Sequence, residues 1–426
     1  MASAADTIFA LSSGRPPAAV AIVRTSGPRA FAAAEALVGT IPKPRVAALR
    51  TIRDPQTGEE IDQALVLRFD SPASATGENI VEYQCHGGRA IVDRLLSALA
   101  DFDGFRLAEP GEFTRRAFAN GRIDLTEAEG LADLLEAETE AQRKAALAMA
   151  EGGLRRRIDD WRERLLDLSA QAEAAIDYVG DEDETAVDIE ALQRELEDLG
   201  NEVGAMVALP RAEPLRDGVR VVVAGPPNAG KSSLINAISQ SERAIVTDIA
   251  GTTRDTIEVP VAIRGIPFLF VDTAGLRESD DQVEAIGVER ARAEVGRADI
   301  LLWLGDPEDA PGNAATLIRA KSDLDPAVVD GRLALSSLTG EGLENLVNKL
   351  VEEAGVIFPA PDQFALNRRQ ATILDDLARA LVGPGDDLVI VAERARNGLS
   401  LLDQLAGRSG VEEMLDRLFG RFCLGK

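Results

Sequence analysis

The segment with the clearest chemistry is Gly225-Pro226-Pro227-Asn228-Ala229-Gly230-Lys231-Ser232, which follows the pattern G-x-x-x-x-G-K-S. In this pattern, the glycines let backbone N–H groups turn toward phosphates, the lysine neutralises the β- and γ-phosphates, and the serine hydroxyl binds Mg²⁺. An apolar run (RVVVA, 220–224) precedes the pattern, and a helix-like segment starting at Ser232 follows it. A helix beginning there would point its positive end at the phosphates. We therefore predict a nucleoside triphosphate site rather than a glycine-rich turn with a chance lysine, with contacts at Asn228, Ala229, Gly230, Lys231, Ser232 and Ser233.

Two further segments supply the remaining parts of a phosphate and metal site. Residues 244–255 (AIVTDIAGTTRD) are polar and suit a switch loop, in which we expect Thr253 to reach Mg²⁺ and the γ-phosphate. Strands at 257–263 and 266–271, joined at Arg264-Gly265, are predicted to form a hairpin. It ends in Asp272-Thr273-Ala274-Gly275. A carboxylate at that strand end can hold Mg²⁺ through water, and the N–H of Gly275 can meet the γ-phosphate.

The base-recognition segment departs from the usual pattern. Ala320-Lys321-Ser322-Asp323 stands where Asn-Lys-x-Asp is expected. Asp323 can accept hydrogen bonds from N1–H and the 2-amino group of guanine, and Lys321 can lie along the base. Ser336 and Ser337 suit the loop whose backbone meets the guanine carbonyl. The missing asparagine would also have tied this segment to the phosphate loop. We therefore expect guanine specificity from Asp323, with weaker nucleotide binding. Leu276 stands where many small GTPases have a glutamine that orients water.

The elements around this site suggest several domains. A length of 426 residues favours two to four of them, and 45% hydrophobic with 4% aromatic residues predicts aliphatic cores. Strand-like runs at 20–24, 64–69 and 80–84, with a helix after Gly87-Gly88, indicate an α/β or α+β domain over residues 1–120.

The middle and end of the chain are predicted to be helical. Thr126 and Glu129 have capping-box spacing at the start of a long helical stretch, with a break at Gly152-Gly153. Further helices are expected at 154–178 and 188–209, then a linker with Pro210, Pro214 and Gly218. We expect the G domain (217–355) to be inserted between helical segments 121–216 and 356–426, because the last segment is too short to be stable alone.

Composition excludes some classes of function. A net charge of −26 argues against general nucleic-acid binding unless a basic patch or a partner carries the RNA. Two cysteines make neither a disulfide framework nor a zinc set. The chain shows no apolar run of membrane-spanning length and no secretory pattern at its start. We expect a cytoplasmic protein without a membrane partner.

The sequence motifs of the G domain resemble those of the MnmE/TrmE family of tRNA modification GTPases. The motifs are GxPNAGKSS, TDIAGTTRD and DTAGLRE followed by VExIGxER. The resemblance implies an α/β plus α fold with a folate-binding-like N-terminal domain, a central helical domain and an inserted Ras-like G domain. It implies K⁺, in place of an arginine finger, and a loop through which two G domains meet. It implies that Glu284 orients the attacking water. The implied K⁺ ligands are Asn228, Thr247, Ile249 and Thr252, and the implied nucleotide contacts include Thr247, Asp248, Ile249, Ala250, Gly251, Thr252, Thr253, Thr273 and Ala274.

Three other segments carry the resemblance beyond the G domain. They are IVRTSG with Arg24, TGENIVEYQCHGG (76–88) and PGEFTRRAFANGRIDLTEAE (110–129). These resemble the family's tetrahydrofolate-binding and dimerisation domain, and imply a 5-formyl or methylene folate held by Arg24, Glu82, Arg122 and Lys426. Arg122 stands where the family usually has lysine. The end of the chain, FCLGK, resembles a C-x-G-K motif and implies that Cys423 lies near the folate or substrate. His86, the only histidine, is interpreted as a turn residue rather than a catalytic one.

The resemblance also implies partners and a reaction. It implies a homodimer and a hetero-oligomer with FAD-containing MnmG (GidA), with tRNA bound mainly through that partner. The pair would add an aminomethyl-type or carboxymethylaminomethyl group to C5 of wobble uridine, with GTP hydrolysis driving a conformational cycle. One alternative is a regulatory G-protein switch, for example in ribosome assembly. Another is a scaffold with a degenerate nucleotide site. The folate-like domain and CLGK favour the modification enzyme.

Overall fold

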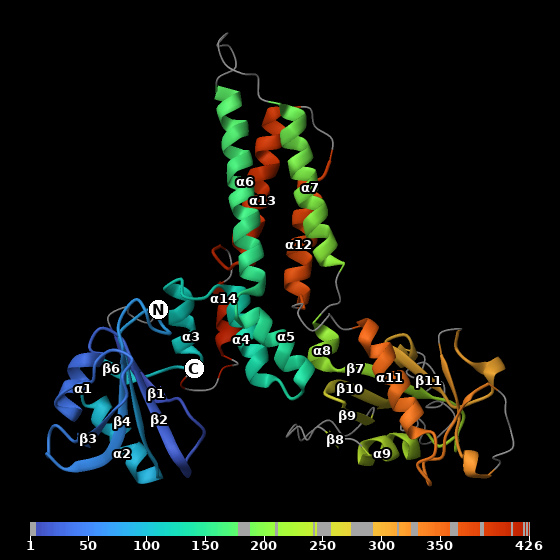
Figure 1. The fold of residues 1–426 in the computed structure, drawn as a ribbon, viewed down its shortest axis with the longest axis horizontal. Coiled ribbons are helices and arrows are strands. Elements are labelled where there is room, and N and C mark those ends of the chain that lie inside the picture. The colour runs from blue at the N-terminus through green and yellow to red at the C-terminus, as the bar shows by residue number, and fades with distance from the viewer. Residues whose placement is uncertain are drawn as a thin grey trace, which may run out of the picture. The chain divides into compact units, whose positions relative to one another are not determined.

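The computed structural model describes residues 6–177, 188–208, 212–241, 243–244, 257–273, 293–312, 315–324, 331–357, 365–383, 387–409, 412–420, 422 and 425. Spatial contacts divide the chain into two compact units, Met1–Ala132 with Asp403–Lys426, and Asp133–Leu402 (Figure 1). Each unit is described in turn. No helix in these ranges has an apolar stretch long enough to cross a bilayer.

The first unit is built on a six-stranded sheet in the order β3-β4-β5-β2-β1-β6. All neighbours are antiparallel except β1 and β6, which are parallel. The strand runs predicted at 20–24, 64–69 and 80–84 lie within β2, β4 and β5 and are confirmed. The strands are β1 (Thr7–Leu11), β2 (Ala18–Ser26), β3 (Ala48–Arg53), β4 (Glu60–Phe69), β5 (Ile80–Gly87) and β6 (Phe105–Leu107).

Two helices, α1 (Ala30–Val38) and α2 (Arg89–Ala100), bury their apolar sides against this sheet. Val23, Val66 and Leu95 belong to the shared core, which is mainly aliphatic as the composition predicts. Beyond the sheet come α3 (Glu112–Ala119) and α4 (Leu125–Glu136), and the C-terminal helix α14 (Glu412–Phe419) returns to pack with them. The two ends of the chain therefore build one unit.

The start of α4 differs from the prediction. Asp124 caps the helix, because its Oδ1 accepts the N–H of Glu127 at 2.9 Å and its own N–H donates to Glu127 Oε2 at 2.8 Å. The predicted capping box at Thr126 and Glu129 is wrong, since α4 already begins at Leu125 and Thr126 lies inside it. The hydroxyl of Thr126 instead donates to Asp124 Oδ1 at 2.7 Å.

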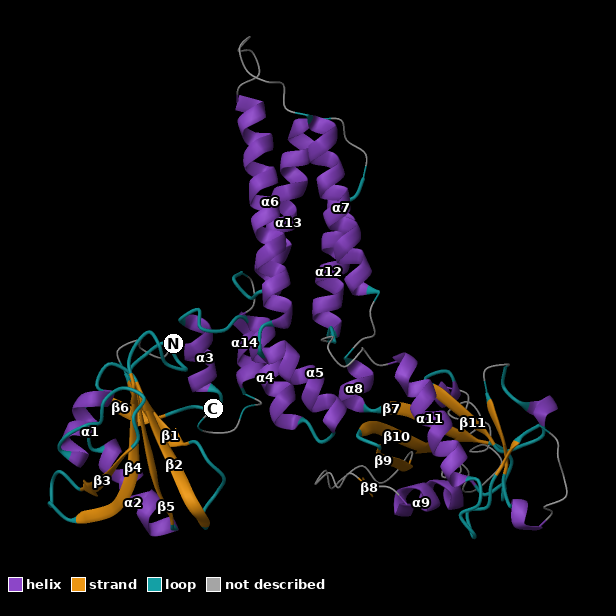
Figure 2. Cartoon of the chain, in the orientation of Figure 1, coloured by secondary structure: helices purple, strands orange, loops and turns teal. Residues whose placement is uncertain are grey.

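The second unit contains a helical bundle, the purely helical part of Figure 2. The predicted break at Gly152-Gly153 is confirmed, and a second break precedes Thr139, whose side chain forms a capping box with Gln142. Helices from before and after the G domain share the bundle, since α7 packs on α12 and Arg396 of α13 pairs with Glu173 of α6. The G domain is thus inserted. The helices are α5 (Glu140–Ala150), α6 (Gly153–Asp177), α7 (Ile189–Val207), α12 (Arg368–Leu381) and α13 (Leu388–Leu405).

The G domain is a seven-stranded sheet in the order β13-β12-β11-β7-β10-β9-β8. The predicted hairpin is confirmed as β9 and β10, which are antiparallel and turn at Arg264 and Gly265, both with positive φ. The predicted linker before this domain contains a short helix, α8 (Glu213–Asp217). The strands are β7 (Val219–Ala224), β8 (Arg243–Ala244), β9 (Ile257–Ile263), β10 (Ile266–Asp272), β11 (Ile300–Trp303), β12 (Thr316–Arg319) and β13 (Leu333–Ala334), with helices α9 (Lys231–Ser241) and α11 (Leu343–Ile357).

Candidate functional site

The phosphate loop lies between buried strand β7 and helix α9, as its sequence predicts. Asn228, Ala229 and Gly230 form the loop, and Lys231, Ser232 and Ser233 open the helix. Lys231 is only 6% exposed, and its Nζ donates to the carbonyls of Gly225 at 3.0 Å and Pro226 at 2.9 Å. The Lys231 ammonium group is therefore held against the backbone of the loop in which phosphates are predicted to bind.

Two oxygen groups meet beside this loop. Ser232 Oγ donates to Asp272 Oδ2 at 2.5 Å, and Asp272 is the buried last residue of β10. Thr273 follows it, and its hydroxyl donates to the carbonyl of Val223 at 2.9 Å, which fixes the end of β10 against β7. Hydroxyl and carboxylate oxygens are hard ligands that suit Mg²⁺. Within the described ranges no group of three or more His, Cys, Asp or Glu residues is placed to hold a metal ion.

The base-recognition segment follows β12. Lys321 has a φ of 58°, and its Nζ donates to the carbonyl of Asn228 at 2.9 Å. Ala320 faces the phosphate loop, since its Cβ lies 3.7 Å from the position a Cβ would take at Gly230. A tie between the two loops is therefore present without an asparagine, which the sequence did not reveal. Asp323, in the short helix Ser322–Leu324, is exposed.

The last loop of the nucleotide site is ordered by one serine. Ser336 is fully buried, and its Oγ accepts the N–H groups of Leu338 at 3.3 Å and Thr339 at 3.2 Å. Ser337 is half-buried beside it. The other residues proposed at this site, Thr247, Asp248, Ile249, Ala250, Gly251, Thr252, Thr253, Ala274, Gly275 and Glu284, lie outside the described residues.

A second site lies in the N-terminal unit. A cavity of about 420 Å³ has two cationic residues, Arg24 and Arg122, in its lining. The Arg24 guanidinium carbon lies 5.7 Å from the centre of the Phe113 ring, and Arg24 Nη2 lies 2.7 Å from Glu82 Oε1. Three residues named for folate are thus brought together, and the fourth, Lys426, lies outside the described residues, as does Cys423. The full lining is Arg24, Ser74, Ala75, Thr76, Phe113, Thr114, Ala117, Arg122, Ile123 and Leu131.

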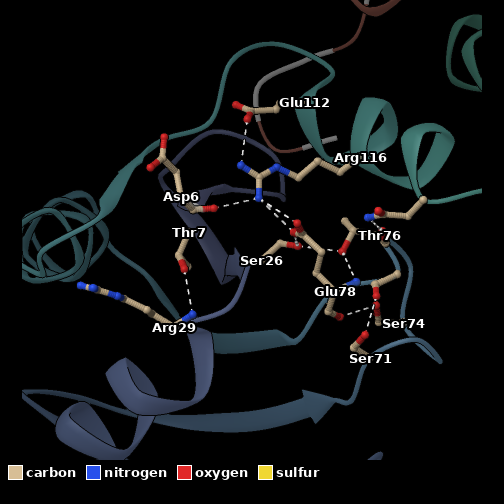
Figure 3. A network of polar contacts seen from close by, with 12 residues as sticks. Asp6, Thr7, Ser26, Arg29, Ser71, Ser74, Thr76, Glu78, Glu112 and Arg116 are labelled. Carbon is tan, nitrogen blue, oxygen red and sulfur yellow. Dashed lines mark hydrogen bonds and ion pairs between the residues drawn. The ribbon is translucent and has the colours of Figure 1, made fainter. Parts of the chain in front are cut away.

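A network of polar side chains includes Ser74 and Thr76, which line this cavity (Figure 3). Arg116 joins Glu78 and Glu112, and Arg106 also contacts Glu112. Burial alone would raise the pKa of Glu112, but hydrogen bonds from Arg106 and from the N–H of Glu109, together with the charges of Arg106 and Arg116, outweigh it, so the pKa lies below its usual 4.5. These residues were not singled out from the sequence, although the segments TGEN and PGEFTRRAF contain Glu78, Glu112 and Arg116.

The sequence's other candidate residues have structural roles. His86 lies in β5 and not in a turn, so that interpretation is wrong, and its Nδ1 is 2.8 Å from Asp62 Oδ1. It is not among the residues that line the cavity. Cys85 is buried, which raises the pKa of its thiol to about 11 and makes it unreactive at neutral pH.

The strand, loop and helix at 219–241, with the Ser232–Asp272 pair and the Lys321 segment, define a P-loop nucleotide-binding domain of the GTPase type. Residues 7–122 match the family model "GTP-binding protein TrmE N-terminus", and residues 125–423 match "MnmE helical domain". The chain belongs to the MnmE family of tRNA modification GTPases.

Full-length relatives agree with this assignment. The tRNA modification GTPase MnmE of Erythrobacter litoralis is 52% identical, covering 99% of this chain and 100% of that protein. Those of Novosphingobium aromaticivorans and Zymomonas mobilis are 50% and 48% identical, each over 99% of this chain and 100% of their own length. Among solved structures, the G domain of the T. maritima FeoB iron transporter is 26% identical, covering 32% of this chain and 98% of that chain, with a TM-score of 0.25. At that TM-score the family assignment stands on the sequence matches alone.

Proposed function

We propose that this protein hydrolyses GTP and couples hydrolysis to modification of C5 of the wobble uridine of certain tRNAs. The observation that carries the proposal is the arginine-lined cavity of the N-terminal unit, in the same chain as an intact phosphate loop. A regulatory switch needs only the phosphate loop. The added group would be of the aminomethyl or carboxymethylaminomethyl kind.

The nucleotide site supports hydrolysis through charge neutralisation and positioning. Lys231 would neutralise the β- and γ-phosphates, and Asp323 would select guanine. Ser232 and Thr253, with Asp272 through water, would hold Mg²⁺, which supplies charge stabilisation between the phosphates. Asn228, Thr247, Ile249 and Thr252 would hold K⁺, which supplies positive charge where no arginine finger is assigned. Glu284 would orient the attacking water and Gly275 would donate to the γ-phosphate.

The N-terminal cavity suits a flat heteroaromatic ligand with an acidic tail. Phe113 offers an aromatic face, and Arg24 and Arg122 offer cations for carboxylates. Glu82 orients Arg24 through their ion pair and can meet a donor edge of a pterin. We infer that the ligand is a tetrahydrofolate derivative in its 5-formyl or methylene form, with Lys426 and Cys423 acting at the same site.

The proposed partners follow from family membership and charge. The protein would form a homodimer through its N-terminal domain and a hetero-oligomer with FAD-containing MnmG (GidA). A net charge of −26 disfavours direct tRNA binding, so the partner would supply most of the tRNA affinity. We place the complex in the cytoplasm with its tRNA.

The test is reconstitution of the reaction. Purified protein, the FAD-containing partner, GTP, a reduced folate and tRNA lacking the modification are combined, and the nucleosides are analysed by mass spectrometry. We expect a modified uridine that is lost in Lys231→Ala and in the double variant Arg24→Ala/Arg122→Ala. Unmodified tRNA throughout, together with GTP-dependent binding to ribosomal subunits, would overturn the proposal in favour of a regulatory switch.

A further inference from the structure

The cavity of the N-terminal unit has two walls from separate parts of the chain. The loop between β4 and β5 contributes Ser74, Ala75 and Thr76. Helix α3 contributes Phe113, Thr114 and Ala117. The separation of the walls therefore depends on contacts between the side chains of the loop and those of the helix.

Glu78 and Arg116 join these two walls (Figure 3). Arg116 Nη1 lies 3.1 Å from Oε1 and 3.0 Å from Oε2 of Glu78. The two side chains are only 11% and 20% exposed. Ser26 Oγ donates to Glu78 Oε2 at 2.7 Å and lies 2.7 Å from Thr76 Oγ1, so the carboxylate also fixes a residue that lines the cavity. Charge-assisted hydrogen bonds with this little exposure are stronger than surface ion pairs.

Arg116 is itself held by further contacts. Its Nη1 donates to the carbonyl of Asp6 at 2.9 Å and its Nη2 to Glu112 Oε1 at 3.2 Å. Arg106 reaches Glu112 at 2.8 and 2.5 Å and the Asp6 carboxylate at 3.4 Å. Three carboxylates thus surround two guanidinium groups. Loss of the charge of Arg116 would leave Glu78 and Glu112 to repel each other and push the loop from the helix.

A second tie lies where α3 ends. Asn120 Nδ2 donates to the carbonyl of Thr76 at 2.7 Å. Gly77 has a φ of 80°, and a Cβ there would lie 2.9 Å from Asn120 Cβ and 3.2 Å from Arg122 Cγ. Glycine at this position lets the loop approach Arg122, which itself lines the cavity. The loop and the end of α3 therefore form a single packed edge of the cavity.

We propose that Glu78 and Arg116 are positioning residues that hold the β4–β5 loop and α3 at the separation needed to bind a reduced folate. This rests on the proposed function of the cavity. Neither side chain lines the cavity. The pair acts through Thr76 on one wall and through Thr114 and Ala117 on the other.

The test measures the affinity of the full chain for 5-formyltetrahydrofolate by isothermal titration calorimetry. We expect Arg116→Met and Glu78→Gln each to weaken binding about tenfold or more, which corresponds to about 1.4 kcal/mol or more. Arg116→Lys should fall between wild type and Arg116→Met, because lysine keeps the charge but not the planar fork. The control, Arg29→Met, removes an ion pair with Asp103 elsewhere in the unit and should bind within about twofold of wild type.

Thermal unfolding of the same samples separates positioning from general loss of structure. Weaker binding with an unchanged unfolding temperature, partly rescued in Arg116→Lys, would support the proposal. Wild-type affinity in both Arg116→Met and Glu78→Gln would overturn it while leaving the folate function intact. If wild type itself binds no reduced folate, the folate function fails and this inference fails with it. Should Arg116→Met not fold, wild-type affinity in both Glu78→Gln and Arg116→Lys would overturn the proposal.

Discussion

Ala320 is the residue at which the nucleotide site departs most clearly from the usual GTPase pattern. It lies against the phosphate loop at Gly230, and Lys321 supplies the tie to Asn228. Ala320→Asn adds one hydrogen-bonding group at this position, for which we expect about 1 kcal/mol, or about fivefold tighter GTP binding. Titration with a fluorescent GTP analogue measures this. Selectivity over ATP should not change, because we propose that Asp323 selects guanine. Equal or weaker binding would show that the Lys321 contact with Asn228 already replaces the tie that an asparagine would make to the phosphate loop.

Glu112 gives the N-terminal unit a predictable response to acid. Its pKa lies below 4.5, because the hydrogen bonds from Arg106 and Glu109 and the charges of Arg106 and Arg116 together outweigh the effect of burial. A carboxyl with a depressed folded-state pKa adds stability above its unfolded pKa and loses it as pH falls through the folded pKa. Glu112→Gln should therefore lower the free energy of unfolding at neutral pH and flatten its decline below about pH 4.5. Denaturant unfolding across pH measures both, and parallel curves for wild type and variant would contradict the assignment.

Sequence predicts residues of the site well where the chemistry is local. The phosphate loop, Ser232 and Asp272 follow from short patterns next to strands, and the structure brings the last two within 2.5 Å. Contacts between distant segments leave no such pattern. Lys321 and Asn228 are 93 residues apart, and Arg116 and Glu78 are 38 apart. Each contact depends on how whole elements are placed, so neither could be predicted from spacing.

Between elements, the sharpest constraint is where α14 meets α3. Gly111 precedes α3 with a φ of 69°, and a Cβ there would lie 2.2 Å from the carbonyl oxygen of Phe419. Gly111→Ala should therefore cost about 2 kcal/mol or more and release α14, from strain and overpacking together. Gly121→Ala is the matched control, because Gly121 has a φ of 67° but open space around it.

Limited proteolysis and denaturant unfolding measure these two variants. Faster cleavage around α14 in Gly111→Ala, with Gly121→Ala close to wild type, is expected. Equal behaviour of the two variants would mean that backbone strain alone matters there. It would also mean that the contact with Phe419 contributes nothing.

For helices and strands, the sequence predicted the type of each element better than its boundaries. Short strand-like runs identified β2, β4 and β5, and Gly152-Gly153 marked the end of α5. The break before Thr139 and the cap at Asp124 were missed, because several residues nearby have capping spacing and only the packed helix decides which one caps. The packing of α14 in the N-terminal unit was also not predicted, because the apolar face of a helix does not indicate which element it packs against.

For the whole molecule, we propose that a GTPase cycle and a modification site are joined in one chain. The G domain is inserted into a helical bundle built from both sides of it. Insertion gives the G domain two covalent connections to the bundle, so a change at the nucleotide can pass to the helices through both. The insertion was predicted because the last segment is too short to fold alone.

The measurement that tests the central claim most directly is GTP turnover by the purified protein in matched KCl and NaCl. Stimulation specific to potassium, lost in Asn228→Ala and in Glu284→Ala, is the result that a cation-assisted GTPase predicts. Asn236→Ala is a suitable control, because Asn236 lies exposed in α9 and is not among the residues proposed to contact the nucleotide or potassium. Equal slow rates in both salts would contradict potassium-assisted hydrolysis and leave a conventional guanine-nucleotide switch.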